Sequence, residues 1–208
     1  MPNSTTGLKS ALRAGSALFL SAGSLAAQDS GSCRYDPIGI VDSSVIEGER
    51  TECDLLNDAV RQARDEFLDA LCALDDAISL RAVPGNYDEI NRLLSLSSDL
   101  LRSSAEKFLI LSEEPRFSSP LPENDQLDIV FGLLESYDVV DPPFDLNGVF
   151  SIWGRAFMDA SEVLEEVSFQ QDLSTRDAYN NILHINGPAM RPAGVFHALD
   201  NFLLGSTF

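Results

Sequence analysis

The sequence predicts an all-α protein, a single-domain bundle of five or six helices that follows an irregular N-terminal arm. Beyond residue 50, apolar residues recur at alternating spacings of three and four, which is the period of an amphipathic helix. Stretches rich in Pro, Gly and Ser separate these periodic segments, and the chain contains no internal repeat. About 180 residues follow the first 28, which is enough for one domain with a sizeable core.

The first 28 residues have the composition of a secretory signal peptide. Lys9 and Arg13 form a basic start, residues 14–20 are a short apolar core, and Ser24 and Ala26 place small residues at a cleavage site. The apolar core is shorter than the roughly 20 residues that span a bilayer, and no later segment is long and apolar enough. We expect cleavage and export to the periplasm or the cell exterior. The form of the signal indicates a bacterial cell.

The exported part of the chain is strongly acidic. All 33 Asp and Glu residues lie beyond residue 28, whereas two of the 14 Lys and Arg residues lie before it. Subtracting 33 from 12 gives a mature net charge of −21. Such a chain repels nucleic acids and anionic lipid surfaces, so a nucleic-acid partner is excluded. Two explanations of the acidity remain open, solubility of an ordinary exported protein and adaptation to a saline habitat.

Residues 29–50 lack a sustained period and predict an irregular arm, with a short strand or turn at residues 38–41. Cys33 and Cys53 flank an irregular stretch that contains Gly and Ser, and a disulfide between them would tie the arm to the first helix. If Cys53 and Cys72 share one helix, their 19-residue separation spans about 28 Å, which no disulfide bridges. A bond between Cys33 and Cys72 stays open. With Cys33 bonded to Cys53, we expect Cys72 to be a buried, inert thiol.

The bundle is predicted over residues 51–208. The first helix begins at Thr51 and ends before Pro84 and Gly85. It is apolar nearly all round over residues 68–74, so we expect it to be the central helix. Its predicted buried seam comprises Leu56, Val60, Ala63, Phe67, Ala70, Leu74 and Ala77.

The second helix is predicted to begin with a capping box formed by Asn86 and Glu89. The short connection makes it an antiparallel neighbour of the first helix. Ser97 and Ser104 fall on its buried stripe, where small side chains permit close approach of another helix. The apolar members of that stripe are Ile90, Leu94, Leu101 and Phe108.

The remaining helices are shorter or more aromatic. A third helix opens at Pro122 or Glu123 and turns Leu127, Val130, Phe131 and Leu134 inward. After a loop over residues 138–147, a fourth helix carries the most aromatic seam, with Phe150, Trp153, Phe157, Ala160, Leu164 and Val167. A fifth helix is predicted from Ser174 to Asn186. A last segment from Pro192 carries Val195, Phe196, Leu199, Phe202 and Leu203.

No catalytic, metal or cofactor site is predicted. The two histidines, His184 and His197, belong to neither of the helical motifs that bind zinc or a di-iron centre. The acidic loop that ends at Asn147 and Gly148 does not match the calcium-binding register of an EF-hand. Nucleophile motifs and glycine-rich phosphate loops are also missing from the sequence.

The sequence therefore favours a non-enzymatic protein that acts through its surface, as a binding or structural component of the cell envelope or exterior. The alternative is a periplasmic module that binds a small apolar or cationic ligand between helices, in a pocket lined by Phe150, Trp153 and Phe157. A weaker alternative is an enzyme with a site built from scattered Asp, Glu, Tyr and Arg residues. The partner is accordingly a protein or a small ligand. A pocket beside Trp153 would favour the module, and a closed core with an exposed apolar patch would favour the surface-acting protein.

Overall fold

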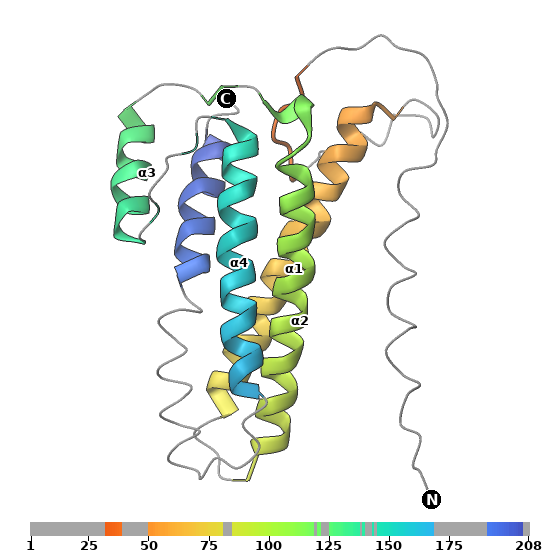
Figure 1. Ribbon diagram of the computed structural model, residues 1–208, viewed down its shortest axis with the longest axis vertical. Helices are drawn as coiled ribbons and strands as arrows, with labels where there is room; N and C mark the ends of the chain where they lie inside the picture. Colours follow the sequence, from red (N-terminus) through yellow and green to blue (C-terminus); the bar gives the residue numbers. More distant parts are fainter. Residues whose placement is uncertain are drawn as a thin grey trace, which may run out of the picture. The chain divides into compact units, whose positions relative to one another are not determined.

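A computed structural model of the chain describes residues 32–38, 50–80, 85–118, 120–121, 125–137, 139, 143, 145–168 and 191–205. Five helices in this part of the chain pack together, and it contains no strand beyond an isolated bridge between Pro120 and Asp145 (Figure 1). The predicted all-α bundle is confirmed. The predicted signal peptide and the helix predicted between Ser174 and Asn186 lie outside the described residues.

The helices begin and end close to where the apolar period predicts. They are α1 (Glu52–Leu80), α2 (Tyr87–Leu111), α3 (Asp125–Ser136), α4 (Leu146–Ser168) and a helix over residues 191–205, with one short 3-10 turn at Pro115–Phe117. None of the described helices is long and apolar enough to cross a membrane.

The two longest helices begin in different ways. At the start of α1, the Asp54 backbone N–H donates to Thr51 Oγ1 over 3.2 Å, and the Thr51 N–H donates to Asp54 Oδ2 over 2.7 Å. This is the reciprocal arrangement of a capping box. The capping box predicted for α2 is wrong, because the Asn86 side chain makes no capping hydrogen bond. Gly85, with a φ of 95°, supplies the left-handed turn between the helices, and Glu89 forms an ion pair with Arg92 instead.

Helix α2 packs along both α1 and α4. Helix α1, which we expected to be central, contacts α2 and also packs Phe67 against Phe157 of α4 and Phe196 of the 191–205 helix. On α2, small residues lie buried toward each neighbour. The Oγ atoms of Ser97 and Ser104 donate to backbone carbonyls of α1, namely Ala70 O at 2.9 Å and Ala63 O at 2.7 Å. The predicted close approach at these two serines is thereby confirmed.

The contact between α2 and α4 is equally close. Ser98 Oγ of α2 donates to the Ser161 carbonyl of α4 over 2.8 Å. About two turns away on α4, a Cβ atom on Gly154 would lie 2.7 Å from Leu109 Cγ and 3.1 Å from the Ala105 carbonyl oxygen. Only a residue without a side chain fits between these helices at that level.

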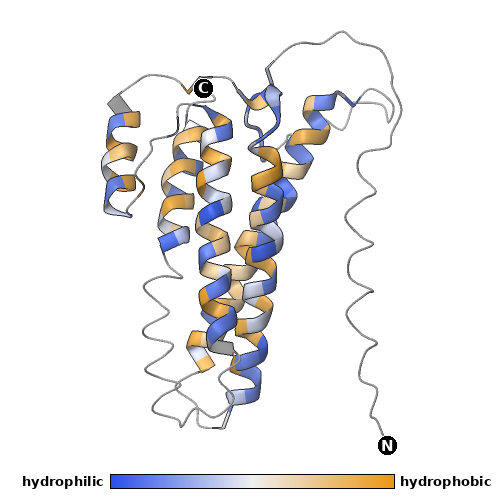
Figure 2. Cartoon of the chain, viewed as in Figure 1, coloured by the Kyte–Doolittle hydropathy of each residue, from blue (hydrophilic) through white to orange (hydrophobic). Residues whose placement is uncertain are grey.

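The core is aromatic and lies between the inward faces of the helices, whose apolar stripes Figure 2 shows in orange. Its central contact is the parallel stack of Phe67 on Phe157, with ring centroids 4.0 Å apart. Stacked and edge-to-face rings stabilise a core beyond the area they bury. Among the described residues, the buried aromatic side chains are Tyr35, Phe67, Phe108, Phe117, Phe150, Trp153, Phe157, Phe196 and Phe202. The seam predicted for the fourth helix is therefore buried from Phe150 through Leu164.

Candidate functional site

The three residues predicted to line a ligand pocket lie inside the closed core. Phe150, Trp153 and Phe157 are each 0% exposed. The Trp153 ring packs against Phe196 and Phe108, with centroid distances of 4.9 and 5.1 Å. Its indole N–H has no hydrogen-bond partner among the described residues. These rings pack against one another between the helices and form part of the buried core.

The N-terminal arm covers one end of this core in an extended conformation. Cys33, Tyr35 and Pro37 are buried, and the residues between them are exposed. The predicted bond between Cys33 and Cys53 is present, with a Cα–Cα distance of 5.4 Å, and the backbone N–H of Cys33 donates to the Arg116 carbonyl over 2.8 Å. The strand or turn predicted at residues 38–41 falls almost wholly outside the described residues, and Ile38 lies in a bend.

Side chains of α1 form hydrogen bonds with the backbone N–H and carbonyl groups of the arm, in the place that a neighbouring strand would take in a sheet. The side-chain amide of Asn57 donates to the Arg34 carbonyl and accepts from the Asp36 N–H, both over 3.0 Å. Arg61 Nε donates to the Pro37 carbonyl over 3.0 Å. An extended segment next to a helix otherwise leaves its polar groups unpaired, so these bonds hold the arm in register.

A buried ionic network joins the arm to two helices. Tyr35 Oη donates to Asp200 Oδ1 over 2.5 Å, and Arg64 Nη2 donates to Asp200 Oδ2 over 3.1 Å. Asp200 lies in the 191–205 helix and is 3% exposed. Burial raises the pKa of Tyr35 far above its ordinary value, and the charge and hydrogen bond of Asp200 raise that pKa further. Burial also lowers the pKa of Arg64, but the hydrogen bond and charge of Asp200 outweigh that effect and raise it.

Cys72 is exposed, so the expectation of a buried thiol is wrong. The expectation was based on the apolar residues on either side of Cys72, in the run over residues 70–74. In the bundle, however, Cys72 shares an outward face of α1 with Asp69 and Asp76, both exposed, while Ala73 and Leu74 turn inward.

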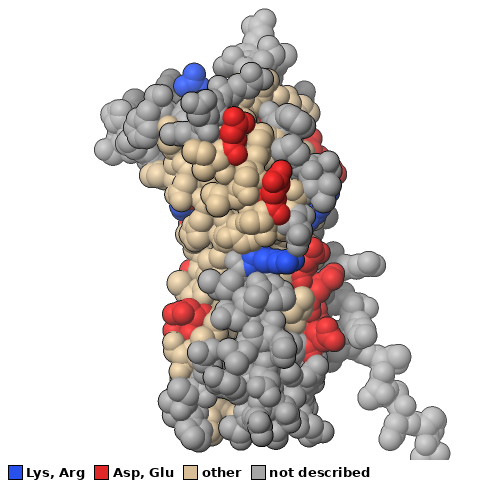
Figure 3. All heavy atoms as spheres, turned by 90° about the vertical axis from the view of Figure 1, so that its left-hand side faces the viewer, with Lys and Arg blue, Asp and Glu red and all other residues tan. Residues whose placement is uncertain are grey.

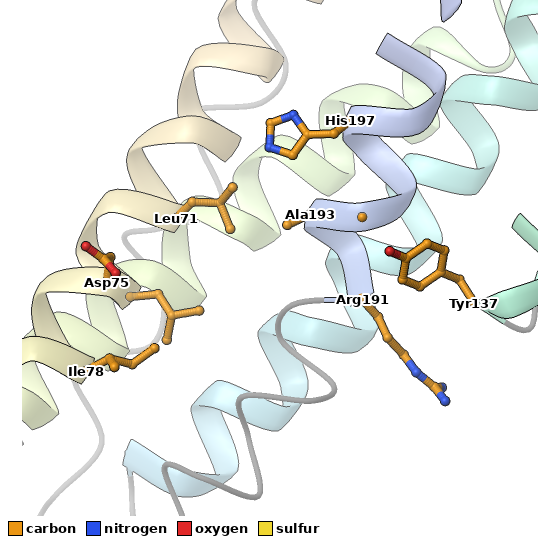
Figure 4. A pocket seen from close by; sticks show the side chains of 9 residues that line it. Leu71, Asp75, Ile78, Tyr137, Arg191, Ala193 and His197 are labelled. Atoms are coloured by element: carbon orange, nitrogen blue, oxygen red, sulfur yellow. The ribbon is translucent and has the colours of Figure 1, made fainter. Parts of the chain in front are cut away.

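A pocket of about 580 Å³ lies between α1 and the 191–205 helix. Figure 4 shows Leu71 and Ile78 of α1 on one side of it and Ala193 and His197 on the other. Asp75, Arg191 and the Tyr137 ring complete the lining that the figure labels. The walls are largely aliphatic, and the ionisable groups lie among them.

Tyr137 reaches this pocket because it has a glycine beneath it. A Cβ atom on Gly194 would lie 2.1 Å from the Tyr137 hydroxyl oxygen, so any side chain there would displace the ring. The backbone N–H of Tyr137 donates to the Leu134 carbonyl over 3.0 Å, in a tight turn at the end of α3. The contact thereby seats α3 against the 191–205 helix.

The opposite side of α3 carries exposed apolar residues. Ile129 is 66% exposed and Leu133 is 47% exposed, and the exposed Gly132 and Ser136 lie on the same side of the helix. We call these four residues the α3 outer face. Figure 3 looks onto the side of the molecule that includes α3 and shows a mainly uncharged area with two acidic side chains on it. An exposed apolar area of this kind marks an interaction surface in many proteins.

Among the described residues, no group of three His, Cys, Asp or Glu side chains is arranged to hold a metal ion. His197 is exposed at the pocket, and His184 lies outside the described residues. Comparisons of the chain with protein-family models, with curated proteins and with solved structures found no match.

Proposed function

We propose that this chain is an exported, acidic, non-enzymatic helical bundle that acts through its surface, as a binding or structural component of the cell envelope or exterior. The observation that carries the proposal is the combination of a closed aromatic core with an apolar face left open on α3. Because Phe150, Trp153 and Phe157 are buried in the core, while Ile129 and Leu133 are exposed, the proposal places recognition on the outside of the molecule.

The arm is consistent with such a role in an oxidising compartment. A disulfide between Cys33 and Cys53 persists where thiols are not kept reduced, as in the periplasm or outside the cell. Covalent closure also protects a short extended segment that would otherwise depend on a few side-chain hydrogen bonds from Asn57 and Arg61.

The export step is tested by expressing the full chain in a bacterium and measuring its intact mass in each cell fraction. We expect periplasmic or extracellular protein that lacks about the first 26 to 28 residues and carries an oxidised Cys33–Cys53 pair. Cytoplasmic protein with Met1 retained and both thiols reduced would overturn the proposal.

The surface role is tested by chemical cross-linking on intact cells of the native host. The exported chain should form a discrete cross-linked species that persists when His184 and His197 are both replaced by Gln. The same species should be lost in the Ile129→Ser/Leu133→Ser variant, whose altered side chains are exposed. If the histidine variant folds but loses its biological activity, the protein uses a metal or catalytic site and the non-enzymatic proposal fails.

The pocket between α1 and the 191–205 helix favours a second candidate, a module that binds a small apolar ligand. Its volume of about 580 Å³ falls within the range of roughly 300 to 1,000 Å³ that is typical of ligand sites. The neutral fluorophore N-phenyl-1-naphthylamine tests this candidate. Binding should weaken in Leu71→Gln and stay unchanged in Leu55→Gln, a substitution at an exposed leucine on the same helix. Equal binding to both variants would place the dye elsewhere.

A further inference from the structure

The α3 outer face is apolar along its centre and acidic along one edge. Ile129 and Leu133 are four residues apart, so their side chains stand one turn from each other, about 6 Å along the helix. Asp128 and Glu135 are exposed and seven residues apart, which places both on the same side of that apolar pair. The face therefore consists of an aliphatic ridge with two carboxylates beside it.

The glycine in this face gives a partner room to approach. A Cβ atom built on Gly132 would meet no atom within 4 Å, so the surface next to Ile129 and Leu133 is open. On the opposite side of α3, Leu127, Val130 and Leu134 are buried. The helix is thus held by its inner face, and its outer apolar residues are exposed to solvent.

Charge decides what can dock on this face. A second copy of the chain would bring another 33 acidic residues against a surface that already carries Asp128 and Glu135. Repulsion between two such molecules opposes self-association through this face. A basic partner is instead attracted by the chain as a whole and is oriented by the two local carboxylates.

We infer that the α3 outer face is the docking site for an amphipathic helix of a partner protein, one with an apolar stripe and Lys or Arg residues along one edge. This inference rests on the proposed surface-acting role. The apolar stripe of the partner covers Ile129 and Leu133 in the helix-against-helix manner that such stripes permit. Its cations, spaced two turns apart, pair with Asp128 and Glu135 and set the direction in which it lies.

A synthetic helical peptide provides the probe. It has Leu at helical spacing on one face and Lys along one edge, and a matched peptide replaces every Lys by Glu. Binding of each labelled peptide to the full chain is measured by fluorescence polarisation in 0.15 M sodium chloride. We expect the Lys peptide to bind and the Glu peptide not to bind. Absence of binding by the Lys peptide at millimolar protein would overturn the inference.

Four variants locate the binding. Ile129→Ser/Leu133→Ser should weaken the Lys peptide by about tenfold or more, and Asp128→Asn/Glu135→Gln by several fold, with a smaller dependence on salt. The matched controls replace an exposed isoleucine and two exposed carboxylates in the same way on other helices. They are Ile110→Ser, at a 71% exposed residue of α2, and Asp65→Asn/Asp69→Asn, at exposed carboxylates of α1; each should change affinity by less than about twofold.

The controls also separate the possible failures. If the α1 acid variant loses as much affinity as the α3 acid variant, the peptide senses only net charge and the inference is wrong. If sedimentation shows a dimer of the chain that Ile129→Ser/Leu133→Ser abolishes, the occupant is a second copy and the inference is again wrong. Either outcome leaves the export test and the proposed surface role untouched, because those depend on signal cleavage and on cross-linking in cells.

Discussion

The hydroxyl of Tyr35 donates a 2.5 Å hydrogen bond to the carboxylate of Asp200, a residue 165 positions later in the chain. This contact places the N-terminal arm against the 191–205 helix, and Arg64 of α1 holds the other carboxylate oxygen. Both Tyr35 and Asp200 are buried, so the hydrogen bond between them is shielded from water, whereas Arg64 is partly exposed. Together with the Cys33–Cys53 bond, the network closes one end of the bundle.

Tyr35→Phe should destabilise the protein by about 1–3 kcal/mol, because the Asp200 carboxylate loses a buried donor while it keeps Arg64. Urea unfolding followed by the fluorescence of the single tryptophan measures the change. Tyr87→Phe, at a half-buried tyrosine on α2, is the control and should have little effect. Equal losses in the two variants would mean that the Asp200 contact contributes nothing to stability.

The same bond predicts a response to alkaline pH. Burial, with Asp200, raises the pKa of folded Tyr35 above the ordinary value of 10.0, so the folded state holds this proton more tightly than the unfolded state. The resulting stability is complete below about pH 10 and is lost as the pH rises above it, by about 1.4 kcal/mol per pH unit for one proton. The slope of stability against pH above 10 should therefore be shallower in Tyr35→Phe than in wild type. Parallel slopes would contradict the assignment.

Cys33→Ala/Cys53→Ala should lower the free energy of unfolding by about 3 kcal/mol, because the bridge closes a loop with a sequence separation of 20. Cys72→Ser is the control and should change it by less than about 0.5 kcal/mol, since this thiol is exposed. Chemical denaturation of the three proteins without reductant makes the comparison. A loss below 1 kcal/mol in the double variant would show that Tyr35, Asn57 and Arg61 suffice to hold the arm.

Local periodicity predicted most of the bundle. The seams of α1, α2 and α4 repeat every three or four residues, and burial follows them because helices bury one face. Even the close approach at Ser97 and Ser104 could be inferred, since both lie on an otherwise apolar stripe. The burial of Cys72 was inferred wrongly, because an apolar run does not reveal which side of a helix its neighbours cover.

The arm and the pocket depend on contacts that no local pattern contains. Cys33, Tyr35 and Pro37 do alternate with exposed residues, but three positions are too few to indicate an extended segment in a helical protein. In the sequence nothing distinguishes Asp200 from the other acidic residues, because its contacts with Tyr35 and Arg64 exist only in the folded chain. The pocket arises where α1 meets residues 137 and 191–197, and none of these residues belongs to the aromatic seam on α4.

The same substitution at two glycines should have opposite effects. Gly154→Ala should cost about 1–3 kcal/mol, because the added Cβ meets the Ala105 carbonyl oxygen at 3.1 Å and Leu109 at 2.7 Å. Gly132→Ala should stabilise the protein by about 0.4–1 kcal/mol, because the site is open and alanine favours the helix. Thermal melts of both variants provide the test. A stable Gly154→Ala protein would mean that α2 and α4 can move apart without loss.

The melting temperature should rise with sodium chloride. The cations that form ion pairs among the described residues include Arg50, Arg61, Arg64, Arg92, Arg102, Lys107 and Arg116. The whole sequence has only 14 Lys and Arg residues against 33 acidic residues, so repulsion among the carboxylates outweighs their pairing. Screening over a Debye length of about 8 Å at physiological ionic strength weakens that repulsion more than it weakens the few surface pairs. A flat or falling melting temperature would instead indicate that local pairing dominates.

Trp153→Ala should cost about 3–5 kcal/mol, since it removes the largest fully buried side chain from between Phe108 and Phe196. Trp153→Phe should cost clearly less, because the smaller ring keeps part of the packing and removes an indole N–H that lacks a partner among the described residues. Urea unfolding followed by circular dichroism measures both variants, which no longer contain tryptophan. If Trp153→Ala kept its stability but lost affinity for N-phenyl-1-naphthylamine, the tryptophan would line a ligand site, and the binding module would replace the surface-acting protein as the proposed function.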